Sequence, residues 1–141
     1  MNNVYVSVGY DDHVKMSEGL ASMIGKVFTQ VTGDPGSGQI VLSNDRESYV
    51  FAHMQDCCEH VTVEDIVGDL QDLVGTPILV AEEVAGTAPA DYECSESFTW
   101  TFYKFATFKG WVDVRWLGES NGYYSESVDL FHITKIIDIA N

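Results

Sequence analysis

The chain has 141 residues, 45% of them hydrophobic, which suits a single domain with one core and excludes a disordered chain. It carries 22 Asp and Glu against 7 Lys and Arg, a net charge of −15, which excludes the extended basic surface that long nucleic acid needs. No apolar run is long enough for a membrane span and the first 15 residues do not resemble a signal peptide, so we expect a cytoplasmic protein.

The first part of the chain predicts a short helix and then an antiparallel meander. Residues 1–19 are expected to be flexible or extended, with Ser17 as a possible N-cap of the helix. Three apolar segments separated by turn-forming residues follow, and their short connections are typical of hairpins. The expected strands are 26–33, 39–44 and 48–55.

The segment VTVEDIVGDLQDLVG, residues 61–75, predicts the clearest helix. Its apolar residues recur at intervals of three and four, as on one face of a helix. Two acids near its start suit the positive end of a helix dipole, and Gly75 with Pro77 supplies a stop. The apolar positions are Val63, Ile66, Val67, Leu70, Leu73 and Val74.

The rest of the chain is expected to be a strand, a loop and a long hairpin followed by a last strand. The two hairpin strands are dense in aromatic and β-branched residues. The segments are a buried strand at 77–84, a loop at 85–96, strands at 97–108 and 110–119, a turn at 120–124 and a strand from 125 that could end in a short helix. We therefore predict one α+β domain over residues 1–141, mainly antiparallel β-sheet with one or two short helices.

Three of the seven cations fall between residues 104 and 115. With Lys109 and Gly110 at the tip of the hairpin, Lys104 faces Arg115 across the strands, and like charges in that position repel. A phosphate between them would reverse the sign, and Trp100 and Phe102 beside them could stack on a base. In the alternative interpretation, neighbouring carboxylates neutralise both cations.

Other groups of reactive residues give weaker signals. In QDCCEH, residues 55–60, consecutive side chains would point to opposite faces of a strand, so we predict no metal site and expect the cysteines to pack. The odd number of cysteines, 3, does not indicate a secreted disulfide framework. Asp65, Asp69 and Asp72 are expected to form a solvated acidic face, and no catalytic motif is present.

Several blocks together resemble a family of small phage proteins, the first-described Thoeris anti-defence proteins. The blocks are HMQDCCEHVTVEDIVGDLQDLVGTPILVAEE, TWTFYKFAT, VDVRWLG and SNGYYSE, and the resemblance extends over about residues 20–133. It implies a non-catalytic sponge that binds a cyclic ADP-ribose immune signal, in some members also cyclic oligonucleotides of the CBASS system at separate sites. It also implies a homodimer or homohexamer that encloses its ligand between protomers.

Carried onto this chain, the resemblance assigns ligand contacts but no catalytic residue, cofactor or metal. Arg115 is the first expected phosphate contact and Lys104 the second. The remaining candidates are Phe98, Trp100 and Phe102 for base stacking, Asn121, Tyr123 and Tyr124 for ribose or phosphate oxygens, and Lys26 as a further cation.

Two other functions stay open. An enzyme could cleave such a signal with the acids around Asp65 and Asp69, with or without a metal. A phage structural or interaction protein could instead use the aromatic hairpin as a protein interface.

Overall fold

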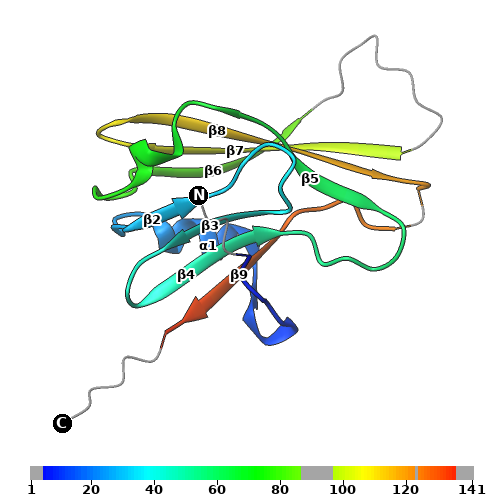
Figure 1. Ribbon diagram of the computed structural model, residues 1–141, viewed down its shortest axis with the longest axis horizontal. Helices are drawn as coiled ribbons and strands as arrows, with labels where there is room; N and C mark the ends of the chain where they lie inside the picture. The colour runs from blue at the N-terminus through cyan, green and yellow to red at the C-terminus, as the bar shows by residue number, and fades with distance from the viewer. Residues whose placement is uncertain (1–4, 87–96, 123, 136–141) are drawn as a thin grey trace.

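The structure, a computed structural model, describes residues 5–86, 97–122 and 124–135, and these residues form two antiparallel sheets (Figure 1). The first sheet has the strand order β1-β9-β4-β3-β2 and the second β5-β8-β7-β6. The strands are β1 (His13–Val14), β2 (Gln30–Thr32), β3 (Gln39–Ser43), β4 (Glu47–Ala52), β5 (His60–Val67), β6 (Val80–Gly86), β7 (Ser97–Thr107), β8 (Gly110–Ser120) and β9 (Asp129–Thr134).

The two sheets share one hydrophobic core. Alternate side chains of a strand point to one face, so each sheet contributes every second residue to the layer between them. Phe51 of β4 reaches across this layer, with its ring centre 4.9 Å from Tyr103 and 5.6 Å from Phe105 of β7. The largest side chains that are fully buried are Trp116, Tyr49, Tyr103, Phe28, Phe51, Phe105 and Phe131.

The N-terminal residues cover part of the other face of the first sheet. Val6 exchanges two hydrogen bonds with the Gln39 side chain, at 2.9 and 2.7 Å. Val6 and Val8 pack on a small second cluster that includes Val50 and Phe131. This cover explains why every residue of β3 is buried.

The predicted α+β class is confirmed, as is the meander of β2, β3 and β4. The expected first helix is α1 (Met16–Met23), and two 3-10 turns, η1 (Tyr10–Asp12) and η2 (Leu70–Leu73), complete the helical content of the described residues. The predicted N-cap is wrong: Lys15 occupies that position, without a capping hydrogen bond from its side chain.

The predicted helix over 61–75 is also wrong, because the chain forms β5 and then η2 there. Val61 and Val63 are buried by alternation against β8, and an irregularity in the register at Glu64 lets Ile66 follow on the same face. Gly68, with a φ of +101°, ends the strand. Asp69 then caps η2 by accepting a hydrogen bond from the Gln71 amide at 2.9 Å.

The long hairpin forms, but two residues away from the predicted register. Thr107 pairs with Gly110, so the turn lies at Phe108 and Lys109. Two residues are one full period of a strand, and the side chains therefore keep the faces that were predicted for them. The Thr107 hydroxyl donates to the Asp72 carbonyl, and Lys109 Nζ donates to the Val74 carbonyl at 2.7 Å, so η2 fixes this turn.

The remaining expectations concern the ends of the second sheet and of the chain. Strand β6 begins only at Val80 and is an edge strand with Val84 exposed, rather than a buried strand from residue 77. Most of the expected loop, residues 87–96, and the expected terminal helix lie outside the described residues. The helices that the structure does describe are too short to cross a membrane.

Candidate functional site

Five of the predicted ligand-binding residues share the outer face of the second sheet. Tyr103 and Phe105 of β7 point into the core, so the alternate residues of that strand point outward. Arg115 of β8 pairs with Phe102 in the register and lies on the same outer side. We call this surface the aromatic face; it consists of Phe98, Trp100, Phe102, Lys104 and Arg115.

Arg115 lies between an aromatic ring and a carboxylate. Its guanidinium carbon is 5.6 Å from the centre of the Phe102 ring, within the range of a cation–π contact. On the other side Nη1 is 3.8 Å from Oδ2 of Asp65, and both side chains are about half exposed, at 44% and 52%. An exposed ion pair of this length contributes about 0–1 kcal/mol, so Arg115 is held only weakly.

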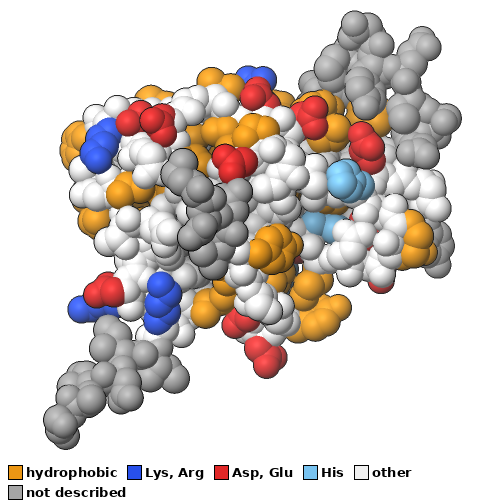
Figure 2. All heavy atoms as spheres, viewed as in Figure 1, with side chains coloured by type: hydrophobic (Ala, Val, Ile, Leu, Met, Phe, Trp, Pro, Cys, Tyr) orange, Lys and Arg blue, Asp and Glu red, His pale blue; other side chains and the backbone are white. Residues whose placement is uncertain are grey.

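The predicted pairing of Lys104 with Arg115 is wrong. Lys104 faces Asp113 on β8 and Glu82 on β6, and Arg115 is its diagonal neighbour, about 7–8 Å away along the sheet. In the described part of the chain Lys104 makes no ion pair closer than 4.0 Å. Both cations thus have carboxylate neighbours, as the alternative interpretation expected. Figure 2 shows only a few Lys and Arg side chains on the face in view, several of them beside acidic side chains.

Trp100 supplies a donor that nothing in the described part of the structure satisfies. Its ring centre lies 6.3 Å from that of Phe102 at an interplanar angle of 65°. Its indole Nε1 is buried and makes no hydrogen bond to any described residue. A buried N–H usually has an acceptor, so this donor is an unsatisfied polar group within the aromatic face.

The SNGYY turn lies at one end of the aromatic face. Gly122 has a φ of +92°, and its amide donates to the Ser120 hydroxyl at 2.9 Å, which shapes the turn. Asn121 is exposed and Tyr124 is half-buried, whereas Tyr123 lies outside the described residues. Asn121 follows Arg115 by six positions, or about 20 Å of strand, so one protomer does not bring both to one small ligand.

Lys26 belongs to a different group of residues, on the first sheet. Its Nζ donates to Oε1 of Glu47 at 2.5 Å and to the hydroxyl of Tyr49 at 2.8 Å. Nε2 of His132 lies 2.8 Å from the same Glu47 oxygen, and the His132 ring stacks on Tyr49 with centres 4.3 Å apart. The predicted Lys26 is therefore an internal partner of Glu47, not part of the aromatic face.

This polar group carries pKa shifts that follow from its contacts. Burial lowers the pKa of Lys26, but the hydrogen bonds to Glu47 and Tyr49 outweigh it and leave the pKa above 10.5. Burial raises the pKa of Glu47, but Lys26 and His132 outweigh it and leave the pKa below 4.5. Sequence reasoning missed the group because its members are far apart in the chain.

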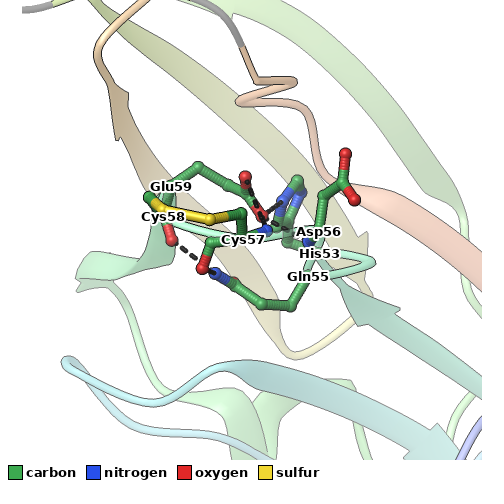
Figure 3. The surroundings of a disulfide bond; sticks show 6 residues. All are labelled: His53, Gln55, Asp56, Cys57, Cys58 and Glu59. Atoms are coloured by element: carbon green, nitrogen blue, oxygen red, sulfur yellow. Dashed lines mark hydrogen bonds and ion pairs between the residues drawn. A yellow bond between two sulfur atoms is a disulfide. The ribbon is translucent and has the colours of Figure 1, made fainter.

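The two adjacent cysteines do not pack in the core as predicted but form a disulfide with each other (Figure 3). Cys57 and Cys58 are exposed, and beside them the side chains of His53 and Glu59 are almost fully buried, at 4% and 0% exposure. His53 Nε2 lies 3.3 Å from Oε1 of Glu59. Adjacent cysteines were the sequence signal for this feature, whereas the His53–Glu59 contact had none.

A groove of about 950 Å³ lies elsewhere, between the β2–β3 hairpin and the end of β5 with η2. None of the predicted ligand-binding residues lines it. Its charged lining residues are Asp34 and Asp69, which do not suit a phosphate. The described residues contain no group of three or more potential metal ligands. Asp65 is the ion-pair partner of Arg115, and Asp69 caps η2.

The fold and these surfaces define a small α+β protein with two antiparallel sheets and one outer face that carries aromatic and cationic side chains. The model of a protein family described as a domain of unknown function, DUF7448, matches residues 21–130, and the chain belongs to this family. The comparison with curated proteins found no match, and neither did the comparison with solved structures.

Proposed function

We propose that this protein is a phage anti-defence protein that binds a cyclic ADP-ribose immune signal in the host cytoplasm and withholds it without cleaving it. The sequence blocks of residues 53–83 and 120–126 support this function by their resemblance to the Thoeris anti-defence family. The structural observation that supports a binding site for this signal is the aromatic face, where the Arg115 guanidinium lies 5.6 Å from the centre of the Phe102 ring. Such a signal needs cations for two phosphates and a flat apolar surface for its adenine.

In this proposal the ligand replaces Asp65 as the partner of Arg115. The existing contact is long, at 3.8 Å, and exposed, whereas hydrogen bonds from a guanidinium to phosphate are charge-assisted and stronger. Lys104, as a diagonal neighbour, would contact the second phosphate. The adenine would stack near Phe102.

We further propose that the ligand lies between subunits of a homodimer or homohexamer. Arg115 and Asn121 are too far apart in one protomer to contact the same small molecule. A neighbouring subunit could bring its own turn to this face and enclose the ligand. Light scattering in the presence and absence of the signal measures this, and a monomer in both conditions contradicts it.

Retention followed by mass spectrometry tests the function. The purified protein is mixed with cyclic ADP-ribose made by a TIR enzyme, separated from free ligand, and denatured by heat, and the released nucleotide is identified. Intact signal, in a constant molar ratio to protein, is expected. A hydrolysed product would instead indicate an enzyme, and no retained nucleotide would indicate an interaction protein.

Two matched variants locate the site. Arg115→Ala should weaken retention by about tenfold or more, because it removes a charge-assisted contact. Arg46→Ala removes the same charge from an exposed turn between β3 and β4 and should leave retention unchanged. Equal retention by all three proteins would place the ligand away from the aromatic face.

A further inference from the structure

We propose that Cys57 and Cys58 form a reversible thiol–disulfide site, whose partners are low-molecular-weight thiols and disulfides. We further propose that the disulfide holds the connection between the two sheets in place. The connection is residues 53–59, which carry the chain from β4 in the first sheet to β5 in the second (Figure 3). This inference does not depend on the proposed ligand.

The disulfide closes a small ring directly after the two backbone amides that bind Glu59. The amides of Asp56 and Cys57 donate to Oε1 of Glu59 at 2.5 and 3.2 Å. The Gln55 side chain donates to the carbonyls of Cys57 and Glu59 at 3.1 and 2.6 Å and closes the turn from the other side. The Cys57 nitrogen is bonded to the Cys57 Cα, which is a ring atom, so the ring restricts the backbone next to the amide that faces the carboxylate.

Glu59 in turn positions His53. Burial raises the pKa of Glu59, but the two amides and His53 outweigh it and leave the pKa below 4.5, so Glu59 is a carboxylate at neutral pH. His53 Nε2 is buried, 3.3 Å from that carboxylate, yet not aligned for a hydrogen bond. The contact therefore depends on where the turn places Glu59.

His53 fastens the turn to a distant segment. Its Nδ1 lies 2.7 Å from the carbonyl of Ser127, and because a carbonyl only accepts, Nδ1 donates. Ser127 lies in the connection between β8 and β9, next to the SNGYYSE block. Hydrogen bonds and the 3.3 Å contact of His53 with Glu59 thus run from Cys57 to Ser127, and join the two most distinctive sequence blocks.

Both cysteines are exposed, so thiols in solution can reach them. A thiolate RS⁻ attacks one sulfur, the disulfide bond breaks, and the released cysteine sulfur takes up a proton. A second thiolate attacks the exogenous sulfur of the mixed disulfide, which leaves as RSSR, and the other cysteine takes up the second proton. Two thiols are thereby oxidised and the cysteine pair is reduced by two electrons; the reverse reaction restores the ring.

The test uses the full-length protein in glutathione buffers of graded composition. After acid quenching and alkylation, the peptide that contains both cysteines should change reversibly between unlabelled and doubly labelled forms. Amide hydrogen exchange on the same samples should show the Asp56 and Cys57 amides exchanging about tenfold faster, or more, in the reduced protein. The Cys57→Ser, Cys58→Ser double variant should match the reduced protein at every buffer composition.

Three outcomes would overturn the proposal. One is full labelling of both cysteines even in the most oxidising buffer. Another is an oxidised protein in which the two cysteines mainly carry glutathione, or in which Cys94→Ser removes their protection from alkylation. Either result would mean that Cys57 and Cys58 form their disulfides with another partner and not with each other. The third is equal exchange of the two amides in both redox states, which would leave the disulfide without influence on the connection.

Discussion

His132 and Glu47 face each other between β9 and β4, with Nε2 of His132 2.8 Å from Oε1 of Glu47. Lys26 approaches the same oxygen at 2.5 Å from the segment after α1. One carboxylate oxygen therefore links the helix to two strands of the first sheet. The Glu47 side chain is 15% exposed and the Lys26 side chain 30% exposed, so water screens these contacts only in part.

We predict that Glu47→Gln lowers the free energy of unfolding by about 1–2 kcal/mol at pH 7, since the charged Lys26 loses its anion. The contribution has two pH limits. Because the pKa of Glu47 is lowered in the folded state, the stabilisation from its carboxylate is lost as pH falls below 4.5. Because the pKa of Lys26 is raised, the stabilisation from its ammonium group is lost as pH rises above 10.5. Urea unfolding between these limits measures the effect, and Asp45→Asn, at an exposed turn, is the control.

Gly68 and Gly36 provide a matched pair for the end of β5. Both have a positive φ, +101° and +88°, but a Cβ at Gly68 would lie 2.5 Å from the Trp111 carbonyl oxygen, whereas one at Gly36 would meet nothing within 4 Å. Gly36→Ala should cost about 1 kcal/mol for the backbone conformation alone. Gly68→Ala should cost clearly more in the same urea titration. Equal costs would mean that β8 can move away from this turn.

The wrong helix at 61–75 has a physical reason that one sequence does not reveal. An extra residue at Glu64 turns the two-residue spacing of a strand into three, from Val63 to Ile66. The 3-10 turn then contributes Leu70 and Leu73, three residues apart. A bulged strand followed by such a turn gives the same apolar spacing as a helix. The hairpin of β7 and β8 was predictable because the alternation of its apolar residues is a local pattern. A register shift of two residues leaves each side chain on the same face of the sheet.

The candidate site residues likewise fall into those that local sequence spacing brings together and those that only long-range strand pairing brings together. Phe98, Trp100 and Phe102 belong to one strand, so alternation alone placed them on one face. Lys26, Glu47 and His132 meet only because β9, the last strand, pairs with β4. That long-range pairing leaves no mark in local spacing. The two-residue error in the hairpin came from Thr107, whose hydroxyl contacts η2, an element that the sequence had assigned to a helix.

Phe51 and Phe105 test whether the two sheets unfold together. Their ring centres lie 5.6 Å apart and each side chain is 1% exposed. Phe51→Ala should cost about 3–5 kcal/mol and leave a single transition by fluorescence and circular dichroism. Separate transitions for the two probes would contradict a shared core.

A double-mutant cycle measures the contact itself. Phe51→Leu and Phe105→Leu should show a coupling of about 0.5–1.5 kcal/mol, as aromatic pairs do. Phe108, in the hairpin turn and 81% exposed, gives the control: Phe108→Leu should cost little and show no coupling to Phe51→Leu.

Glu126 should dominate the response to acid at the other end of the second sheet. Its carboxylate accepts hydrogen bonds from the hydroxyl of Ser120 and, at 2.8 Å, from that of Thr99, and the residue is 9% exposed. Burial raises the pKa of Glu126, but the bonds from Ser120, Thr99 and Ser97 outweigh it and leave the pKa below 4.5. The stabilisation is therefore present above 4.5 and is lost as pH falls through the folded-state pKa.

Glu126→Gln keeps the shape of the side chain but cannot titrate. We predict that it lowers the free energy of unfolding by about 1 kcal/mol at pH 7, because hydroxyl donors bind an amide oxygen less strongly than a carboxylate. The difference from the parent protein should shrink steadily below pH 4.5, where the parent loses its charge. Glu18→Gln, at an exposed position on α1, should show neither effect. A difference that stays constant down to low pH would assign the loss to packing rather than to charge.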